Sequence, residues 1–291
     1  MKKAKSIVGS QCALGEGPIW DDQRSRLFWV DILGKTVHWS DDHGGNHQTF
    51  VAPDYVSNIF LTEGDEVILS LPDGFHLWIP ESGQLTAWVK FPEYDSALRT
   101  NDGFCDVHGN LWIGTMALSE EPELGKLYLL DGDLNWHMML DRTSISNGIR
   151  CADDGKTYYY IDTPTQKIRE FRFDPDQKTW EWVRDVIDFS TDLGHPDGMS
   201  MDENGRLWVS MWNGYGVLCV DPKTGEVLEK VEVAAPQVSA NIFGGSGMDQ
   251  LFITTARKLL PDATLNEYPL TGDLFHTSMD VKGGPTYRRR L

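Results

Sequence analysis

Residues 194–211 read GHPDGMSMDENGRLWVSM, a polar segment followed by a short apolar run that is typical of a β-strand. Similar runs, rich in aromatic and β-branched residues, recur along the chain. They begin near Leu27, Val67, Leu111, Thr157, Leu207 and Leu251. The intervals are 40, 44, 46, 50 and 44 residues, and a period of this length is the signature of a repeat architecture.

Further short strands are expected between these runs, for example TVHWS at 36–40, GKLYLL at 125–130 and KIREFRFD at 167–174. Four short strands in each repeat match one blade of a β-propeller. Six such repeats account for the 291 residues. The sequence therefore predicts an all-β fold, a six-bladed β-propeller formed by residues 1–291 as a single domain. A large β-sandwich is the main alternative, but it does not require a regular period.

The two ends of the chain are expected to close the ring. KSIVGSQ at 5–11 and GDLFHTSMDV at 272–281 could both supply strands to the last blade, which would protect its sheet edges. A short helix is expected within residues 256–265, ARKLLPDATL. The basic cluster at 288–290 ends the chain, and we expect it to be a solvated tail.

Composition excludes several classes of partner. The chain has 26 Lys and Arg against 44 Asp and Glu, a formal net charge of −18, which disfavours binding to nucleic acid. No apolar run approaches the ~18 residues that a membrane span needs. The N-terminal residues lack the apolar stretch of a signal peptide, so a cytoplasmic location is expected. The expected partner is a small molecule, and nothing in the sequence points to a particular oligomeric state.

A polar side chain lies nine to eleven residues before each repeated strand. The six residues are Glu16, Asn58, Asn101, Asn147, Asp197 and Asn241. Equivalent positions on the innermost strands of a propeller encircle its channel, so these side chains are expected to converge at one end. Two carboxylates and four amides offer hard oxygen ligands, which suit calcium, magnesium, manganese or zinc. With three protein ligands, such an ion would keep open positions, as catalytic metals do.

Local turn chemistry is the competing explanation for this pattern, because Asn and Asp before Gly are favoured turn formers. It could account for Asn147 and Asp197, which each precede a glycine. It explains Glu16 poorly, and it does not apply to Asn58 or Asn241, which are followed by Ile.

Six short motifs resemble the regucalcin/gluconolactonase family, also called the senescence marker protein family. They are LGEGPIW at 14–20, RTNDG at 99–103, GTM at 114–116, SNGI at 146–149, PDGM at 196–199 and ITTAR at 253–257. The resemblance covers nearly the whole chain and is strongest to the bacterial sugar lactonases. It implies a six-bladed propeller that binds one divalent metal ion (Ca, Zn, Mn, Mg or Fe) in its channel and hydrolyses sugar lactones.

The same resemblance implies roles for individual residues. The metal ligands of the family match Glu16, Asn147 and Asp197, and its substrate-binding residues match Arg99 and Asn101. We expect Asp197 to be catalytic as well, since a carboxylate beside the ion could take a proton from the attacking water. Arg99 and Asn101 are expected to orient the lactone through hydrogen bonds.

One position departs from the family pattern. Regucalcin-like members follow GTMA with an acidic residue that touches the sugar, whereas this chain has Leu118 there. Glu120 or Glu121 could take over that contact, or the pocket is less polar at this point. His195, two residues before Asp197, is a further candidate for the channel mouth.

The predicted function is metal-dependent hydrolysis of a sugar lactone, such as gluconolactone, xylonolactone or arabinolactone, to the aldonic acid. Two alternatives stay open: a non-catalytic propeller that binds calcium or a metabolite, and a hydrolase of other activated esters. Arg99 with Asn101 is the feature that distinguishes an enzyme from a simple metal buffer, because a protein that only binds a cation has no use for an arginine, whose positive charge opposes the cation.

Overall fold

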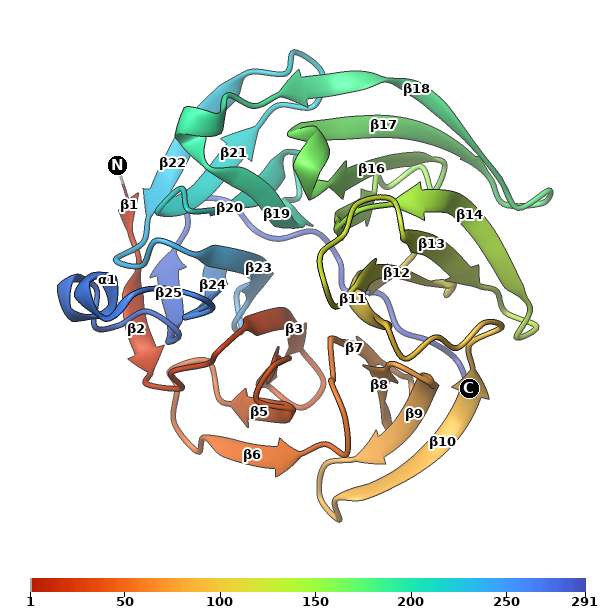
Figure 1. Ribbon diagram of the computed structural model, residues 1–291, viewed down its shortest axis with the longest axis horizontal. Coiled ribbons are helices and arrows are strands. Elements are labelled where there is room, and N and C mark those ends of the chain that lie inside the picture. Colours follow the sequence, from red (N-terminus) through yellow and green to blue (C-terminus); the bar gives the residue numbers. More distant parts are fainter. Residues whose placement is uncertain (1) are drawn as a thin grey trace.

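The computed structural model describes residues 2–291, whose strands form six mainly antiparallel sheets arranged as blades around a central channel (Figure 1). In each blade the first strand lies next to the channel, and the following strands lie progressively further out. The predicted all-β, six-bladed propeller is thereby confirmed. Every repeated run in the sequence forms the second strand of a blade.

The first three blades take their strands in sequence order. Blade one contains β3 (Gly15–Asp21), β4 (Arg26–Asp31), β5 (Thr36–Ser40) and β6 (Gln48–Val51). Blade two contains β7 (Asn58–Leu61), β8 (Val67–Leu71), β9 (Gly74–Ile79) and β10 (Gln84–Lys90). Blade three contains β11 (Leu98–Cys105), β12 (Leu111–Ala117), β13 (Gly125–Leu130) and β14 (Trp136–Thr143).

The last three blades continue this order. Blade four contains β15 (Ser146–Cys151), β16 (Thr157–Asp162), β17 (Lys167–Asp174) and β18 (Thr179–Asp188). Blade five contains β19 (His195–Met201), β20 (Leu207–Trp212), β21 (Gly216–Val220) and β22 (Val227–Glu232). Blade six contains β23 (Val238–Gly244), β24 (Gln250–Thr255) and β25 (Leu274–Ser278).

The N-terminal residues add strands to two blades. Strand β2 (Lys5–Val8) pairs antiparallel with β25 and supplies the fourth strand of blade six. Strand β1 (Lys2–Lys3) pairs in parallel with β22 at the edge of blade five. Residues 2–8 therefore cover two strand edges that would otherwise be open to pairing with other chains.

Helical segments are short. Two 3₁₀ turns, η1 (Thr163–Thr165) and η2 (Thr191–Leu193), follow β16 and β18, and the six-residue α1 (Asp262–Glu267) lies between β24 and β25. The helix expected within 256–265 begins only at Asp262, directly after Pro261. Within residues 2–291 the structure has no helix with the length and apolar character needed to cross a lipid bilayer.

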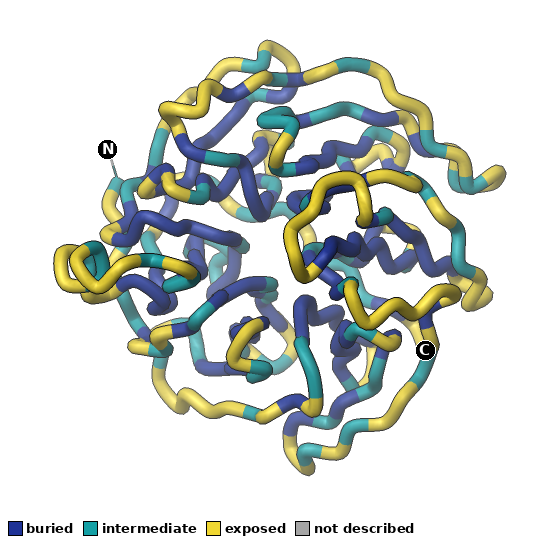
Figure 2. The backbone as a smooth tube through the Cα atoms, viewed as in Figure 1, coloured by how far each residue is buried: buried dark blue, intermediate teal, exposed yellow. Residues whose placement is uncertain are grey.

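Apolar side chains fill the spaces between neighbouring blades, so the inner strands are buried while the outer strands are largely exposed (Figure 2). Tryptophans of the repeated strands supply much of this core. The indole N–H of Trp112 donates to Asp106 at 2.8 Å, and that of Trp208 donates to Asp202 at 3.0 Å. The carboxylates of Asp106 and Asp202 also accept backbone N–H groups from the turn that leads into the second strand of the blade. Each carboxylate therefore links this turn to a buried tryptophan.

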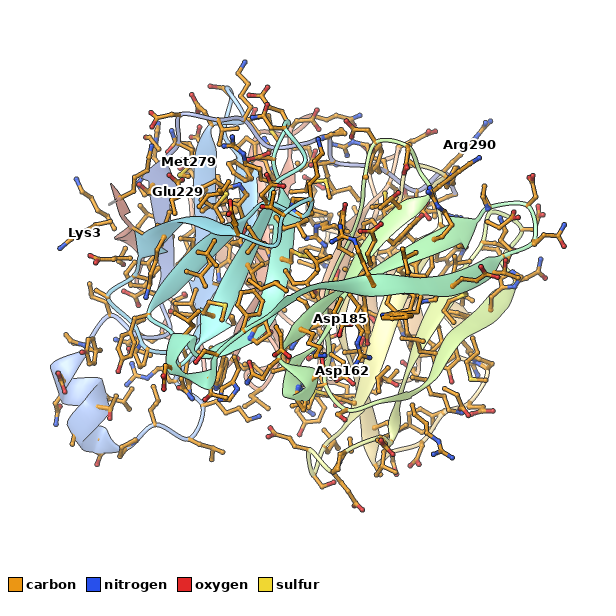
Figure 3. All side chains as sticks on the ribbon, turned by 90° about the horizontal axis from the view of Figure 1, so that it is seen from above. Lys3, Asp162, Asp185, Glu229, Met279 and Arg290 are labelled. Carbon is orange, nitrogen blue, oxygen red and sulfur yellow. The ribbon has the colours of Figure 1, made fainter. Side chains whose placement is uncertain are left out.

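The prediction of a solvated C-terminal tail is wrong for Arg288 and Arg289, which the fold holds in place, whereas Arg290 is exposed. Arg289 is only 3 % exposed, and its guanidinium donates to the carbonyl oxygens of Gly109 and Asp131 at 2.8 Å each. Arg288 donates to Asp21 at 2.8 Å. The hydrogen-bond acceptors of these two arginines lie in turns of blades one and three. The sequence does not reveal that these turns lie beside the C-terminus. In the side view of Figure 3, Arg290 lies at the face opposite the helix α1.

Candidate active site

A cavity of about 390 Å³ lies at the end of the channel where the inner strands of four blades begin. All five site residues predicted from the sequence line it: Glu16, Arg99, Asn101, Asn147 and Asp197. They come from β3, β11, β15 and β19, and each lies within the first four residues of its strand. The structure therefore brings together side chains that are separated by up to 181 residues in the sequence.

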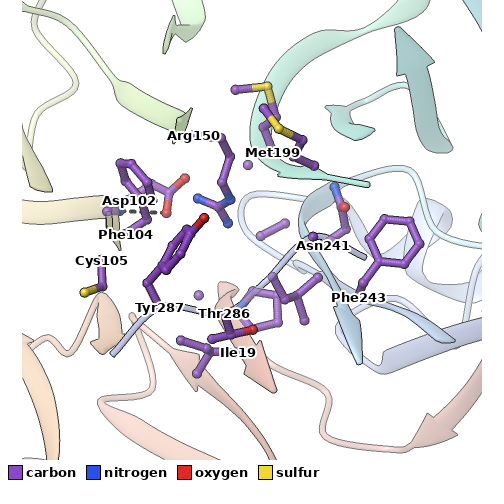
Figure 4. A pocket seen from close by; sticks show the side chains of 18 of the residues that line it. Ile19, Asp102, Phe104, Cys105, Arg150, Met199, Asn241, Phe243, Thr286 and Tyr287 are labelled. Carbon is purple, nitrogen blue, oxygen red and sulfur yellow. Dashed lines mark hydrogen bonds between the residues drawn. The ribbon is translucent and has the colours of Figure 1, made fainter. Parts of the chain in front are cut away.

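Two members of the predicted ring of six do not reach this cavity, which corrects the expectation that all six converge. Asn58 and Asn241 instead line a second cavity of about 100 Å³, which residues 284–287 cover (Figure 4). The side-chain amide of Asn58 donates to Asp102 at 3.1 Å, and that of Asn241 donates to the carbonyl oxygen of Trp208 at 2.9 Å. Both amides are therefore held by a neighbouring blade, away from the first cavity.

A β-bulge explains which side chains reach the first cavity. In the inner strands of blades one, three, four and five, the pairing register shifts at or directly after the predicted residue. No shift occurs in β7 after Asn58, and in β23 the shift lies before Asn241. An extra residue in a strand redirects the side chains around it, so the bulge decides which end of the channel a polar residue faces.

The glycines after the polar residues belong to these bulges and not to turns between strands. A Cβ atom on Gly148 would lie 2.7 Å from the Cβ of Met199, and one on Gly198 would lie 2.7 Å from the Cβ of Ala240. The inner strands of neighbouring blades therefore approach too closely for a side chain at these positions. This contact between blades, and not turn chemistry, accounts for the Asn-Gly and Asp-Gly pairs.

Two carboxylates in the cavity have few hydrogen-bond donors. Glu16 and Asp197 are 7 % and 5 % exposed, and the buried Oδ1 atom of Asp197 has no hydrogen-bond partner. The Glu16 carboxylate accepts one bond of 3.3 Å, from the N–H of Gly17. Because burial disfavours the charged form, the pKa of Glu16 rises to about 8, with the nearby Asp102 carboxylate as a second cause.

The pKa of Asp197 is also raised well above its ordinary value, first by burial and then by the charges of Glu16 and Asp102. Buried carboxylates that lack donors fit a cation, which would compensate their charge. Among residues 2–291, no group of three or more His, Cys, Asp and Glu side chains is arranged around a common point. A third ligand would have to be an oxygen of another type, and the Asn147 amide can supply one.

Hydrogen bonds join the remaining predicted residues into one network. Arg99 donates to Oδ1 of Asn101 at 2.6 Å, and Nδ2 of Asn101 donates to Oδ1 of Asn147 at 2.9 Å. Nδ2 of Asn147 donates to the hydroxyl of Thr163 at 2.7 Å. Burial lowers the pKa of Arg99, while the nearby carboxylates of Glu16, Glu120 and Asp197 counteract this effect. The guanidinium is therefore a buried positive charge at the wall of the cavity.

Charged side chains from two loops meet at the mouth of the cavity. Lys258, before α1, contacts the carboxylate of Glu120, which follows β12. Glu120 lines the cavity, whereas Leu118 does not and is 43 % exposed. Of the two glutamates proposed to replace the acidic residue of the family, Glu120 is thus the one at the cavity. His195 lines it as well.

Sequence reasoning missed several lining residues, among them Thr163, Trp212 and Lys258. Each lies at or shortly after the end of the second strand of its blade. Because the first two strands are antiparallel, the end of the second strand lies beside the start of the first, at the same end of the channel. Because the repeat period locates the second strand of each blade, it also locates the residues at the end of that strand.

Comparison with known proteins gives consistent matches over the whole chain. The family model described as SMP-30/Gluconolactonase/LRE-like region matches residues 14–257. An uncharacterised protein of Sulfolobus acidocaldarius is 38 % identical over 97 % of this chain and 98 % of its own length. A Bacillus subtilis protein named "Putative sugar lactone lactonase YvrE" is 33 % identical over 94 % of each chain. A crystal structure from Agrobacterium tumefaciens, titled as a calcium-binding protein, regucalcin, is 26 % identical with a TM-score of 0.92, covering 100 % of this chain and 99 % of that chain.

Proposed function

Because this chain belongs to the SMP-30/gluconolactonase/LRE-like family, we propose that it hydrolyses a sugar lactone to the aldonic acid, with one divalent metal ion bound in its channel. The name of the Bacillus subtilis relative supports the reaction class. The single observation that carries the proposal is the convergence of Glu16, Asn147, Asp197, Arg99 and Asn101 on one cavity. A cavity of about 390 Å³ is large enough for a monosaccharide-sized ring.

Glu16, Asn147 and Asp197 would hold the ion. The unpartnered Oδ1 of Asp197 and the poorly solvated carboxylate of Glu16 supply two anionic oxygens, and Asn147 supplies a neutral one. When bound, a divalent ion in such a site acts as a Lewis acid and lowers the pKa of water. Calcium, zinc, manganese, magnesium and iron are all compatible with this ligand set.

Asp197 would move the proton. Hydrolysis forms a bond between the water oxygen and the lactone carbonyl carbon, and then breaks the bond between that carbon and the ring oxygen. The oxygen of the Asp197 carboxylate that does not bind the ion would accept the proton of the attacking water and return it to the departing ring oxygen, which becomes a hydroxyl group.

Arg99 and Asn101 would orient the substrate. Within residues 2–291, Arg99 donates two hydrogen bonds, one to the carbonyl oxygen of Thr100 and one to the side chain of Asn101. The same terminal nitrogen makes both of them. Its other N–H groups can therefore donate to the lactone carbonyl or to a ring hydroxyl. Such bonds to a charged donor are each worth about 1.5–3 kcal/mol. They would hold the carbonyl carbon in a fixed position beside Asp197.

Acid release measured in a pH-stat tests the proposal. Gluconolactone, xylonolactone, arabinolactone and galactonolactone are each supplied to the protein after chelation and after addition of Ca²⁺, Mn²⁺, Zn²⁺ or Mg²⁺. We expect acid release above the rate without protein only when an ion is present. The matched variant Asp197→Asn should lose this activity.

The regucalcin title of the Agrobacterium relative favours a second function, in which the cavity only binds calcium. Ion binding without acid release from any lactone would support that function. Acid release from other activated esters, but not from lactones, would instead assign the same site to a different hydrolase.

A further inference from the structure

The network at the cavity ends in a residue that neither the sequence motifs nor the comparisons assign. Thr163 is the first residue of the 3₁₀ turn η1 and lies directly after β16 of blade four. Its hydroxyl accepts from Nδ2 of Asn147 at 2.7 Å and donates to the carbonyl oxygen of Pro196 at 2.8 Å. Pro196 immediately precedes Asp197 on β19 of blade five. One hydroxyl group therefore links the strands that carry two of the proposed metal ligands.

The direction of every hydrogen bond in this network is fixed by its two ends. A guanidinium can only donate, so Oδ1 of Asn101 must face Arg99, and its Nδ2 must face Asn147. A peptide carbonyl can only accept, so the Thr163 hydroxyl must donate to Pro196 and accept from Asn147. Both ends place the amide oxygen of Asn147 toward Asn101 and its nitrogen toward Thr163. The donors and acceptors at the two ends of the network therefore fix the orientation of the Asn147 amide.

This orientation decides whether Asn147 can bind a cation. An amide presents either an oxygen, which is a metal ligand, or an NH₂ group, which repels a cation. Oδ1 of Asn147 has two lone pairs, and the bond from Asn101 uses one of them. Within residues 2–291 no other hydrogen bond is made to this oxygen, and Asn147 lines the cavity, so the second lone pair can bind an ion while Thr163 holds the NH₂ group.

We propose that Thr163 is a positioning residue for the metal site. Its hydroxyl holds the amide of Asn147 with the oxygen available to the ion, and it fixes β15 against β19 beside Asp197. This inference rests on the proposed function, since it takes Asn147 and Asp197 as ligands. Outer residues that orient metal ligands typically change metal affinity by about 10–100-fold when they are removed.

Substitutions at residue 163 can separate the hydroxyl from the rest of the turn. Thr163→Val keeps the shape and removes the hydroxyl, while Thr163→Ser keeps the hydroxyl. The backbone N–H of Thr163 donates to Ile145 at 3.1 Å, and neither substitution affects this bond. Thr165→Val is the matched control, because the Thr165 hydroxyl in the same turn donates to the backbone carbonyl oxygen of Asp162 at 2.7 Å and takes no part in the network.

Titration calorimetry with Mn²⁺ and Ca²⁺ on the full chain gives the dissociation constants. We expect Thr163→Val to weaken ion binding by about 10-fold or more. Thr163→Ser and Thr165→Val should retain the affinity of the unchanged chain. Equal affinity for Thr163→Val, or equal losses for Thr163→Val and Thr165→Val, would overturn the inference while leaving the proposed function intact. Failure of the unchanged chain to bind any of Mn²⁺, Ca²⁺, Zn²⁺ and Mg²⁺ would overturn the proposed function itself.

A second measurement is made without any ion. In protein labelled with ¹⁵N-asparagine, the side-chain NH₂ protons of Asn147 should exchange with solvent faster in Thr163→Val than in the unchanged chain or in Thr163→Ser. Thr163→Ala serves the same purpose if the valine variant does not fold. Unaltered exchange in a folded variant that lacks the hydroxyl would show that Thr163 does not hold the amide.

Discussion

Asp31 and Asp162 occupy equivalent positions at the ends of β4 and β16, and each accepts backbone hydrogen bonds from the segment that leads into a proposed metal ligand. Asp31 accepts from Leu14 at 2.9 Å, two residues before Glu16. Asp162 accepts from Ile145 at 2.8 Å, two residues before Asn147. The same local device thus fixes the start of the inner strand in blades one and four.

Asp31→Ala is expected to destabilise the fold. Besides Leu14, the carboxylate accepts from Ala13 and Gly34, at 2.8 and 2.9 Å. A buried donor left without a partner costs about 1–3 kcal/mol, so the free energy of unfolding should fall by at least this amount. Urea denaturation measures the change. Asp95→Ala is the control, because Asp95 accepts from Ala97 in an exposed loop, where water can replace it.

The stability of the metal-free protein should decrease with rising pH because of Glu16. Its pKa is about 8 in the folded protein against an ordinary value of 4.5, so the folded state binds the proton more tightly than the unfolded state. The resulting stability is present below pH 4.5 and is lost as the pH rises toward 8. Each pKa unit corresponds to about 1.4 kcal/mol, so the effect amounts to a few kcal/mol.

Urea unfolding of the chelated protein at pH 5 and pH 8 measures this slope. Glu16→Gln should flatten it, and a saturating divalent ion should stabilise the protein at pH 8 because it binds the folded state alone. If the chelated protein and Glu16→Gln show the same pH dependence, Glu16 does not titrate as described.

Arg99→Gln is expected to raise the KM for sugar lactones and to reduce kcat/KM. Removing hydrogen bonds from a charged donor costs about 1.5–3 kcal/mol, which corresponds to a decrease of about 10- to 150-fold. Steady-state kinetics on the most active lactone measure it. Arg26→Gln provides the comparison, because Arg26 contacts Glu81 at 2.8 Å away from the cavity. Unchanged kinetics in Arg99→Gln would remove Arg99 from the substrate site.

Deletion of residues 1–8 should destabilise the propeller strongly. It removes β1 and β2, so β25 loses its outer partner and becomes an exposed edge. Thermal unfolding and light scattering should show a lower Tm and aggregation. Deletion of residues 290–291, both exposed, serves as the control. A deletion of 1–8 that melts like the intact chain would contradict the closure of the ring by the N-terminal strand.

The fold could be predicted from the sequence because each blade repeats a strand with a preceding polar turn, and these features are local. The end of the channel that each polar residue faces could not be predicted in the same way. Asn58 and Asn147 both lie near the start of an inner strand, and the glycine that follows Asn147 but not Asn58 is the local sign that only Asn147 precedes a bulge. A bulge depends on the pairing with the second strand, which is decided by the packing of whole blades.

The burial of Arg289 could not be predicted from the sequence either, because its hydrogen-bond partners are backbone carbonyl oxygens more than 150 residues away along the chain. Carbonyl groups carry no signature in a sequence. Thr163 and Lys258, by contrast, could have been found, since they follow second strands whose positions were already known from the repeat.

The most direct test is a crystal structure of the full chain soaked with Mn²⁺, with anomalous scattering used to locate the ion. Our account predicts one strong site within about 2.0–2.6 Å of oxygen atoms from Glu16, Asn147 and Asp197. An ion bound elsewhere in the channel, or no ion at a concentration that supports lactone hydrolysis, would contradict it.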